Sequence, residues 1–211
     1  MRNIRILTLL TLFSCMAIFA CEQNNLPSKL PYIGQHSFAN GDTLFYKIPT
    51  FDFIDQDKNQ VTNQSFKDHI YISDFFFTSC PSICPKVKKQ MLRIYDKYEK
   101  TDLIKMVSHT LDPVRDDADM LKGYAKNLGV NTNKWMFLTG EKDELREMAL
   151  KYFVAVVEDE EAPGGLDHSG KIVVVDKKGH VRAFAEGTDP DDVTDLMKEI
   201  DVLINEYNTE D

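Results

Sequence analysis

The stretch Phe75-Phe76-Phe77-Thr78-Ser79-Cys80-Pro81-Ser82-Ile83-Cys84-Pro85 decides the fold of this chain. Residues 71–78 form a nearly continuous apolar and aromatic run, which is typical of a strand covered on both faces, as in a parallel sheet. Pro85 suits the first turn of a helix, where its missing N–H is no loss. Apolar residues then recur at helical spacing from Val87 to Tyr98. The sequence therefore places two cysteines in a turn between a buried strand and a helix.

Strands and helices alternate along the rest of the chain. Residues 45–53 and 60–62 flank a polar turn and predict an N-terminal β-hairpin. This order predicts an α/β fold, a three-layer sandwich with a mixed sheet and an N-terminal β-hairpin extension. A strand, a two-cysteine turn and a helix in that context are the thioredoxin-like arrangement. The remaining predicted strands are 103–110, 135–138, 172–176 and 181–185, and the remaining helices are 115–127, 143–152 and 191–207.

The first residues have the composition of a bacterial export signal. Arg2 and Arg5 precede a short apolar run, residues 6–19, which is too short to span a bilayer comfortably. The pattern resembles a lipoprotein signal, so we expect residues 1–20 to be removed and Cys21 to carry the lipid; an ordinary cleaved signal or an uncleaved anchor is the alternative. The expected divisions are a flexible tether over 21–44, one domain over 45–207 and a tail over 208–211.

The net charge of the chain limits the kinds of molecule that it is expected to bind. The formal charge of −9 becomes −11 when Arg2 and Arg5 leave with the signal. An acidic chain is a poor partner for nucleic acid and offers no basic patch to anionic lipid. Attachment to the bacterial cell membrane is therefore expected through acyl chains on Cys21, with the domain facing the periplasm or another extracytoplasmic space.

Cys80 and Cys84 are the thiols left to the domain, because Cys15 and Cys21 fall in the export signal. The N-terminus of the following helix and the lysines after it favour thiolate over thiol. Three residues separate the two cysteines, where thioredoxin-type redox sites have two. In a helix-like turn, positions four apart lie on one face with Cα atoms about 6 Å apart, so both sulfurs can converge on one metal. A disulfide also fits this separation, so redox chemistry and a structural bridge remain open.

A metal site requires further ligands, and the chain has five histidines. His168 stands in Asp167-His168-Ser169-Gly170, before a predicted strand, where a thioredoxin-like fold brings its loop to face the cysteine turn. His109 ends a predicted strand and is a second candidate to approach the site. Two thiolates and one imidazole form a soft ligand set, suited to copper and acceptable to zinc. The remaining three histidines are expected at the surface or at element boundaries: His36, His69 and His180.

Several motifs, in this order, closely resemble those of the Sco/SenC family, the copper-binding proteins required for cytochrome c oxidase assembly. The resemblance runs from about residue 45 to 203. Each motif alone is weak, and their combination is highly specific. The motifs are Phe76-Phe77-Thr78-Ser79-Cys80-Pro81-Ser82-Ile83-Cys84-Pro85, Leu111-Asp112-Pro113-Val114-Arg115-Asp116, Trp135-Met136-Phe137-Leu138-Thr139-Gly140 and Asp167-His168-Ser169.

The resemblance implies that Cys80, Cys84 and His168 are copper ligands. It implies a membrane-tethered copper chaperone that delivers Cu(I) or Cu(II) to the binuclear copper centre of cytochrome c oxidase, with an upstream copper donor or thiol reductant as a further partner. Asp112 matches the family's Asp-Pro motif, where its carboxylate either tunes the site from outside the ligand shell or only starts the next helix. The acidic stretch over residues 158–161 departs from the family and bears on the choice of partner.

The same thiols support other functions. Asp74 interrupts the apolar strand six residues before Cys80, and it is either a proton acceptor for thiol chemistry or a carboxylate paired with a neighbour. The alternatives to a chaperone without turnover are a thiol–disulfide oxidoreductase that reduces the cysteines of the oxidase copper site, and a redox or copper sensor.

Overall fold

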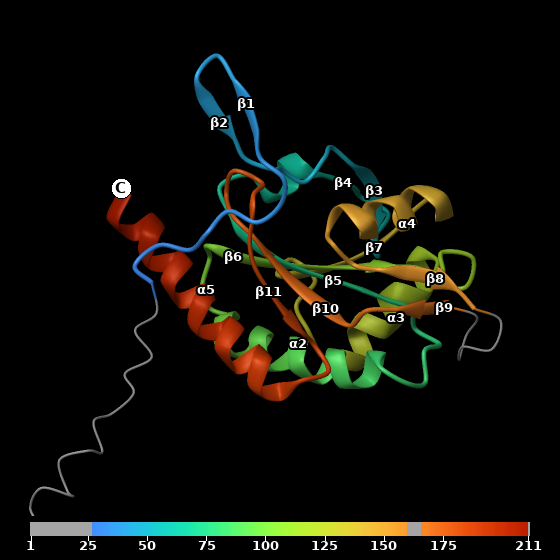
Figure 1. The fold of residues 1–211 in the computed structure, drawn as a ribbon. Helices are drawn as coiled ribbons and strands as arrows, with labels where there is room; N and C mark the ends of the chain where they lie inside the picture. The colour runs from blue at the N-terminus through green and yellow to red at the C-terminus, as the bar shows by residue number, and fades with distance from the viewer. Residues whose placement is uncertain (1–26, 160–165, 211) are drawn as a thin grey trace, which may run out of the picture.

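The structure is a computed structural model, and it describes residues 27–159 and 166–210. Its centre is a mixed seven-stranded sheet in the order β11-β10-β5-β6-β7-β3-β4 (Figure 1). The three central strands β5, β6 and β7 are parallel, and the strands on both sides of them are antiparallel. The strands are β3 Asp52–Asp55, β4 Gln60–Thr62, β5 Ile70–Phe76, β6 Ile104–Thr110, β7 Trp135–Thr139, β10 Lys171–Val175 and β11 Val181–Glu186.

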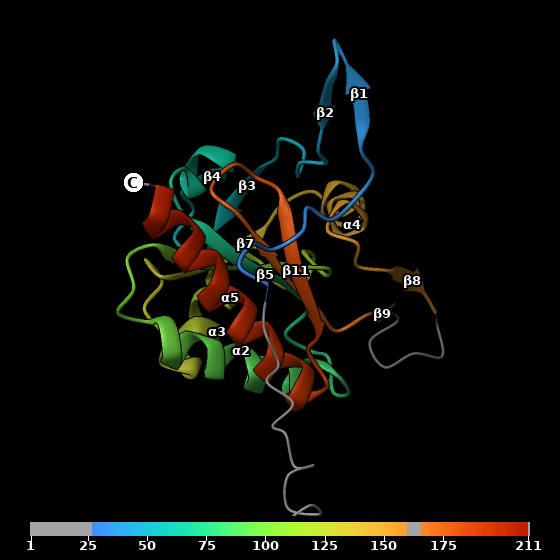
Figure 2. The ribbon, with the colours of Figure 1, turned by 60° about the vertical axis from the view of Figure 1, so that its left-hand side comes forward.

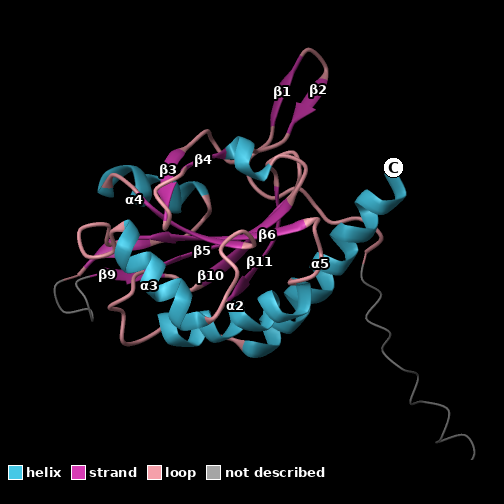
Figure 3. Ribbon diagram, turned by 180° about the vertical axis from the view of Figure 1, so that it is seen from behind, coloured by secondary structure: helices cyan, strands magenta, loops and turns pink. Residues whose placement is uncertain are grey.

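Helices cover both faces of this sheet. Three of them, α2, α3 and α5, lie on one face, and α4 lies on the other, as the two opposite views show (Figures 1 and 3). This confirms the predicted α/β thioredoxin-like class with a mixed sheet. The helices are α2 Cys84–Tyr98, α3 Ala118–Leu128, α4 Lys142–Lys151 and α5 Pro190–Glu210, with a short 3-10 helix η2 at Asn63–Phe66.

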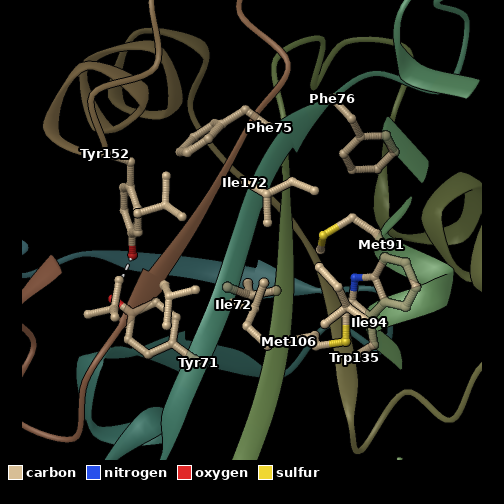
Figure 4. Close-up of a cluster of buried hydrophobic side chains, with 14 of the residues drawn as sticks. Tyr71, Ile72, Phe75, Phe76, Met91, Ile94, Met106, Trp135, Tyr152 and Ile172 are labelled. Carbon is tan, nitrogen blue, oxygen red and sulfur yellow. Dashed lines mark hydrogen bonds between the residues drawn. The ribbon is translucent and has the colours of Figure 1, made fainter. Parts of the chain in front are cut away.

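Strand β5 forms the middle of the core and carries the chain to the cysteine turn. All seven of its residues are buried, as the continuous apolar run predicts for a strand covered on both faces. Figure 4 shows Phe76 on the side of the sheet where Met91 and Ile94 of α2 meet Trp135, while Phe75 lies nearer to Tyr152. The cysteine turn therefore starts from the most buried part of the sheet.

One helix begins later than the sequence predicts. The predicted helix 115–127 is α3, which starts at Ala118 because the Asp117 side chain accepts a hydrogen bond from the Met120 N–H and caps it. Asp116 cannot join the helix in the same way, because its carboxylate is directed inward to Thr78 and Thr110. Residues 112–116 form a turn instead.

The segment before the domain also makes contacts. Leu30 is buried, and its carbonyl oxygen accepts a hydrogen bond from Arg182 of β11. The predicted hairpin over 45–53 and 60–62 is β3–β4, whose first strand begins only at Asp52. Strands β1 Ser37–Ala39 and β2 Asp42–Leu44 form a second hairpin that extends from the body (Figure 2). Contacts with the domain therefore begin ahead of the predicted boundary at residue 45. The predicted signal and Cys21 lie outside the described residues. Within 27–159 and 166–210, no helix is long and apolar enough to cross a membrane.

Candidate metal centre

The two thiols lie at the junction of β5 and α2. The Cys80 N–H donates a hydrogen bond to the Phe77 carbonyl oxygen at 3.2 Å, which forms the turn, and Cys84 is the first residue of α2. Asp116 stabilises the turn, since its carboxylate accepts hydrogen bonds from both the backbone N–H and the hydroxyl of Thr78. Both cysteines are buried and neither is in a disulfide. The sequence marked the thiols but gave no sign of the Asp116 contact.

His168 lies close to the thiols in space although it is 84 residues after Cys84 in the sequence. It ends β9 (Leu166–His168), a strand that pairs with β8 (Val156–Glu158) and that the sequence did not predict. Its Nδ1 lies 3.1 Å from the Ser169 carbonyl oxygen. A carbonyl oxygen only accepts, so Nδ1 carries the proton and Nε2 keeps its lone pair. Nε2 lies 3.5 Å from the Cys84 sulfur.

Three ligand atoms therefore converge at one point. The two sulfurs and one imidazole nitrogen of Cys80, Cys84 and His168 all lie within 4.8 Å of one another, and all three residues are buried. Bonds of about 2.3 Å to sulfur and 2.0 Å to nitrogen place ligand atoms of one metal about 4 Å apart in a trigonal site. The donor set is soft, which suits Cu(I). Among the described residues, no other group of three His, Cys, Asp or Glu side chains has this arrangement.

The two thiols differ in acidity. Burial raises the pKa of Cys80, but hydrogen bonds with the Cys84 thiol and with the backbone N–H groups of Cys84 and Ser82 outweigh it, and the pKa falls below its usual value. Burial, followed by the hydrogen bond to Cys80, holds the pKa of Cys84 well above its usual value. The sequence predicts that the helix N-terminus favours thiolate at both sulfurs; in the structure the pKa falls at Cys80, through hydrogen bonds of the turn, and rises at Cys84. Burial also lowers the pKa of His168, which keeps its imidazole neutral.

Two glycines hold the His168 loop against α2. The Gly187 N–H donates to the Gly170 carbonyl oxygen at 2.8 Å. A Cβ at Gly187 would lie 2.5 Å from that oxygen, and a Cβ at Gly170 would lie 2.9 Å from Val87 on α2. A side chain at Gly187 would therefore require the backbone to move, and one at Gly170 would require neighbouring side chains to shift. Sequence reasoning missed Gly187, because the contact joins two loops that are distant in the chain.

Asp112 and His109 do not join the three ligand atoms. Asp112 pairs with Arg115 at 2.5 Å. His109 lies in the core, where its ring stacks on Phe75 with a centroid distance of 4.7 Å, and burial lowers its pKa to about 4. His36 is exposed and His69 is half-buried, whereas His180 is buried against the carbonyl oxygen of Tyr46.

Two further acidic features were singled out in the sequence, Asp74 and the stretch over residues 158–161. Asp74 is a paired carboxylate, because Lys88 Nζ lies 3.0 Å from its Oδ2. Glu158 ends β8, and residues 160–165 of the acidic and glycine-rich loop that follows lie outside the described residues. The influence of residues 158–161 on partner choice stays a prediction.

Comparison with known proteins agrees with this site. A family model described as SCO1/SenC matches residues 43–204. The chain belongs to the SCO1/SenC family. This Sco/SenC chain is 30% identical over 161 residues to the SCO1 protein homolog of Bacillus subtilis (strain 168), covering 75% of this chain and 83% of the relative. It also resembles two solved Sco structures.

The first is BsSco, a member of the Sco family of cytochrome c oxidase assembly proteins in which a disulfide switch was identified. It has a TM-score of 0.65 and 29% identity, covering 75% of this chain and 93% of BsSco. The second is Arabidopsis thaliana ScoI with copper bound, with a TM-score of 0.65 and 26% identity, covering 77% of this chain and all of that structure. The Sco/SenC prediction made from the motifs is confirmed.

Proposed function

We propose that this chain is a membrane-tethered copper chaperone that holds copper through Cys80 Sγ, Cys84 Sγ and His168 Nε2. The observation that carries the proposal is the convergence of these three atoms within 4.8 Å. The copper ion is the cargo, and the protein supplies the soft ligands and a buried site that excludes competing water. A related Sco protein was solved with copper bound.

Copper would be delivered to the binuclear copper centre of cytochrome c oxidase during its assembly. The relative BsSco is a cytochrome c oxidase assembly protein. Transfer between proteins proceeds by exchange of thiolate and imidazole ligands, so the two cysteines must be reduced for loading. We expect a lipid on Cys21 to hold the domain at the bacterial cell membrane on its extracytoplasmic side.

Each ligand has a distinct part in binding. Cys80 supplies the more acidic thiol, and coordination would draw the proton from Cys84, whose burial otherwise keeps it a thiol. His168 presents its lone pair toward Cys84 because Ser169 fixes the tautomer. A hydrogen bond of this kind orients a metal-bound histidine and raises its basicity.

Titration of the reduced full-length chain with Cu(I), against a chromophoric Cu(I) chelator, tests the proposal. We expect one Cu(I) per chain, and His168→Ala should weaken binding at least about tenfold. His69→Ala is the matched control, because His69 is not part of the three-ligand group and hydrogen-bonds to the Lys67 carbonyl oxygen instead. Equal affinity in the wild type and His168→Ala would contradict the three-ligand site.

A thiol–disulfide oxidoreductase is the second candidate, and the asymmetry of the thiols favours it. A thiol of lowered pKa attacks a disulfide of the target, and the neighbouring thiol then resolves the mixed disulfide; the chain ends as the Cys80–Cys84 disulfide and the target gains two thiols. A disulfide switch was identified in the relative BsSco. A redox or copper sensor would use the same pair. A chain that binds no copper but rapidly reduces a disulfide substrate supports the enzyme.

A further inference from the structure

A buried ion pair lies behind the two thiols. Lys88 Nζ is 3.0 Å from Asp74 Oδ2, and the side chains are only 4% and 1% exposed. Lys88 also donates to the Ser108 hydroxyl oxygen at 3.1 Å, and Ser108 donates in turn to the other oxygen of Asp74. Trp135 Nε1 completes the network with a hydrogen bond to Ser108 at 2.9 Å. The ammonium and both oxygens of the carboxylate therefore all have partners in this network.

Stability alone is a weak reason for this pair. A buried ion pair usually contributes no more than well-packed apolar residues of similar volume, because both charges lose their hydration. The surroundings of Lys88 are aromatic: its Nζ lies 4.2 Å from the centre of the Phe76 ring and 5.0 Å from that of Trp135. An aliphatic side chain on α2 would suit such a pocket. The ion pair is more easily explained by what lies beside it.

Lys88, the positive member of the pair, lies on the same helix as Cys84 and lines a cavity with both thiols. Cys84 and Lys88 are four residues apart on α2, which places them on one helix face with Cβ atoms about 5–6 Å apart. Both residues, with Cys80, line one cavity of about 320 Å³ between α2 and α3. Asp74 reaches Lys88 from β5 and is not among the residues that line this cavity. Lys88 therefore contacts Asp74 through its ammonium and borders the cavity of the two thiols, and its charge acts to lower the pKa of Cys84.

We propose that the Lys88 ammonium, held in place by Asp74, stabilises the anionic complex of Cu(I) with two thiolates and so sets the preference of the site for Cu(I) over Cu(II). This inference rests on the proposed function. Two thiolates and a neutral imidazole give a site charge of −1 with Cu(I) and zero with Cu(II). A fixed positive charge at short range in a buried site favours the more negative form. The one electron that separates the two forms comes from an external redox partner.

The affinity of the chain for Cu(I) divided by its affinity for Cu(II) measures this effect directly. The ratio is obtained on the full-length chain by competition with chelators of each ion, and the midpoint potential of bound copper is measured with redox dyes. Asp74→Asn combined with Lys88→Gln removes both charges and retains hydrogen-bonding groups. We expect the ratio to fall about tenfold in this double variant, equivalent to about 59 mV for a one-electron couple. Asp74→Asn alone should raise the ratio, because the cation is then unopposed.

A buried pair elsewhere gives the matched control. Arg182 and Glu206 are buried and 2.8 Å apart, where β11 meets α5. Arg182→Gln combined with Glu206→Gln should lower the thermal stability and leave the affinity ratio unchanged. If instead the ratio of this control falls as far as in the Asp74 and Lys88 double variant, the effect is general loosening and the proposal fails.

Two results would overturn the inference without affecting the proposed function. The first is a folded Asp74→Asn, Lys88→Gln variant whose ratio stays within twofold of the wild type, which makes the pair purely structural. If that variant does not fold, Asp74→Asn alone decides, and a ratio at or below that of the wild type overturns the proposal. A wild-type chain that binds no copper, by contrast, refutes the proposed function itself.

Discussion

His168 Nε2 lies 3.5 Å from Cys84 Sγ, although 84 residues separate them in the chain. The contact joins the N-terminus of α2 to the end of β9, a strand that lies outside the seven-stranded sheet. Packing of the loops around Gly170 and Gly187 holds these elements together. The geometry of the candidate site therefore depends on backbone packing outside the ligands.

Gly187→Ala tests that dependence. The new Cβ would lie 2.5 Å from the Gly170 carbonyl oxygen, so the His168 loop must move. We expect the free energy of unfolding to fall by about 1–3 kcal/mol, and Cu(I) affinity to fall as His168 is displaced. Urea unfolding and chelator competition measure the two effects. The control is Gly123→Ala in α3, where nothing lies within 4 Å of the new Cβ and a small gain in stability is expected. Unchanged copper affinity in Gly187→Ala would show that the loop tolerates the shift.

Asp116→Ala should loosen the cysteine turn. Its carboxylate accepts hydrogen bonds from the Thr78 N–H, the Thr78 hydroxyl and the Thr110 hydroxyl. Leaving such buried donors unpaired lowers the free energy of unfolding by about 3 kcal/mol, which calorimetry or urea unfolding detects. Stability equal to that of the wild type would mean that water replaces the carboxylate.

Asp112→Ala is the comparison for Asp116→Ala. Asp112 pairs with the exposed side chain of Arg115, so its loss should change the free energy of unfolding by no more than about 1 kcal/mol. We expect Cu(I) affinity to stay within twofold of the wild type. A tenfold loss of affinity would instead support the other interpretation of the Asp-Pro motif, in which this carboxylate tunes the metal site.

The buried His109 should make folding stability depend on pH. Burial lowers its pKa to about 4 in the folded chain, against 6.5 in the unfolded chain. The unfolded state therefore binds more protons between pH 6.5 and 4, and stability is lost as the pH falls through this window. The full difference is about 3 kcal/mol. Urea unfolding between pH 4.5 and 7.5 gives the slope. His109→Phe keeps an aromatic ring among Phe75 and Tyr152 and should reduce that slope; an unchanged slope assigns it to other groups.

Arg182→Ala should release the segment ahead of β1. Arg182 binds the Leu30 and Pro31 carbonyl oxygens and neutralises the buried carboxylates of Asp176 and Glu206. Removing one member of a buried charge cluster costs about 3–5 kcal/mol. Faster limited proteolysis near Leu30, followed by mass spectrometry, is the second measurement.

Lys97→Ala provides the reference for Arg182→Ala. Lys97 and Asp201 form an ion pair whose side chains are 39% and 48% exposed, and such pairs contribute about 0.2–1 kcal/mol. Proteolysis near Leu30 should match the wild type in this variant. An Arg182→Ala chain that is no less stable than Lys97→Ala would contradict the buried cluster as the attachment of the N-terminal segment.

The sequence alone determined the fold class and predicted the three residues that converge at the candidate site. A continuous apolar run before Cys80 requires a strand buried on both faces, and Pro85 with the periodicity after it requires a helix, because these patterns are local. The Sco/SenC motifs then singled out His168 among five histidines. The predicted thioredoxin-like fold also placed the loop of His168 opposite the cysteine turn.

Only the tertiary structure decided how those residues are held and how acidic they are. The opposite pKa shifts of Cys80 and Cys84 arise from their burial, which the packing of distant elements creates, and from hydrogen bonds within the turn itself. Lys88 is one of several lysines near the start of α2, and nothing in the local sequence separates it from the others. Its side chain is nevertheless buried, and its ammonium pairs with Asp74 of β5, where the helix packs on the sheet. Contacts of this kind depend on the packing of whole elements, and a local pattern carries no record of them.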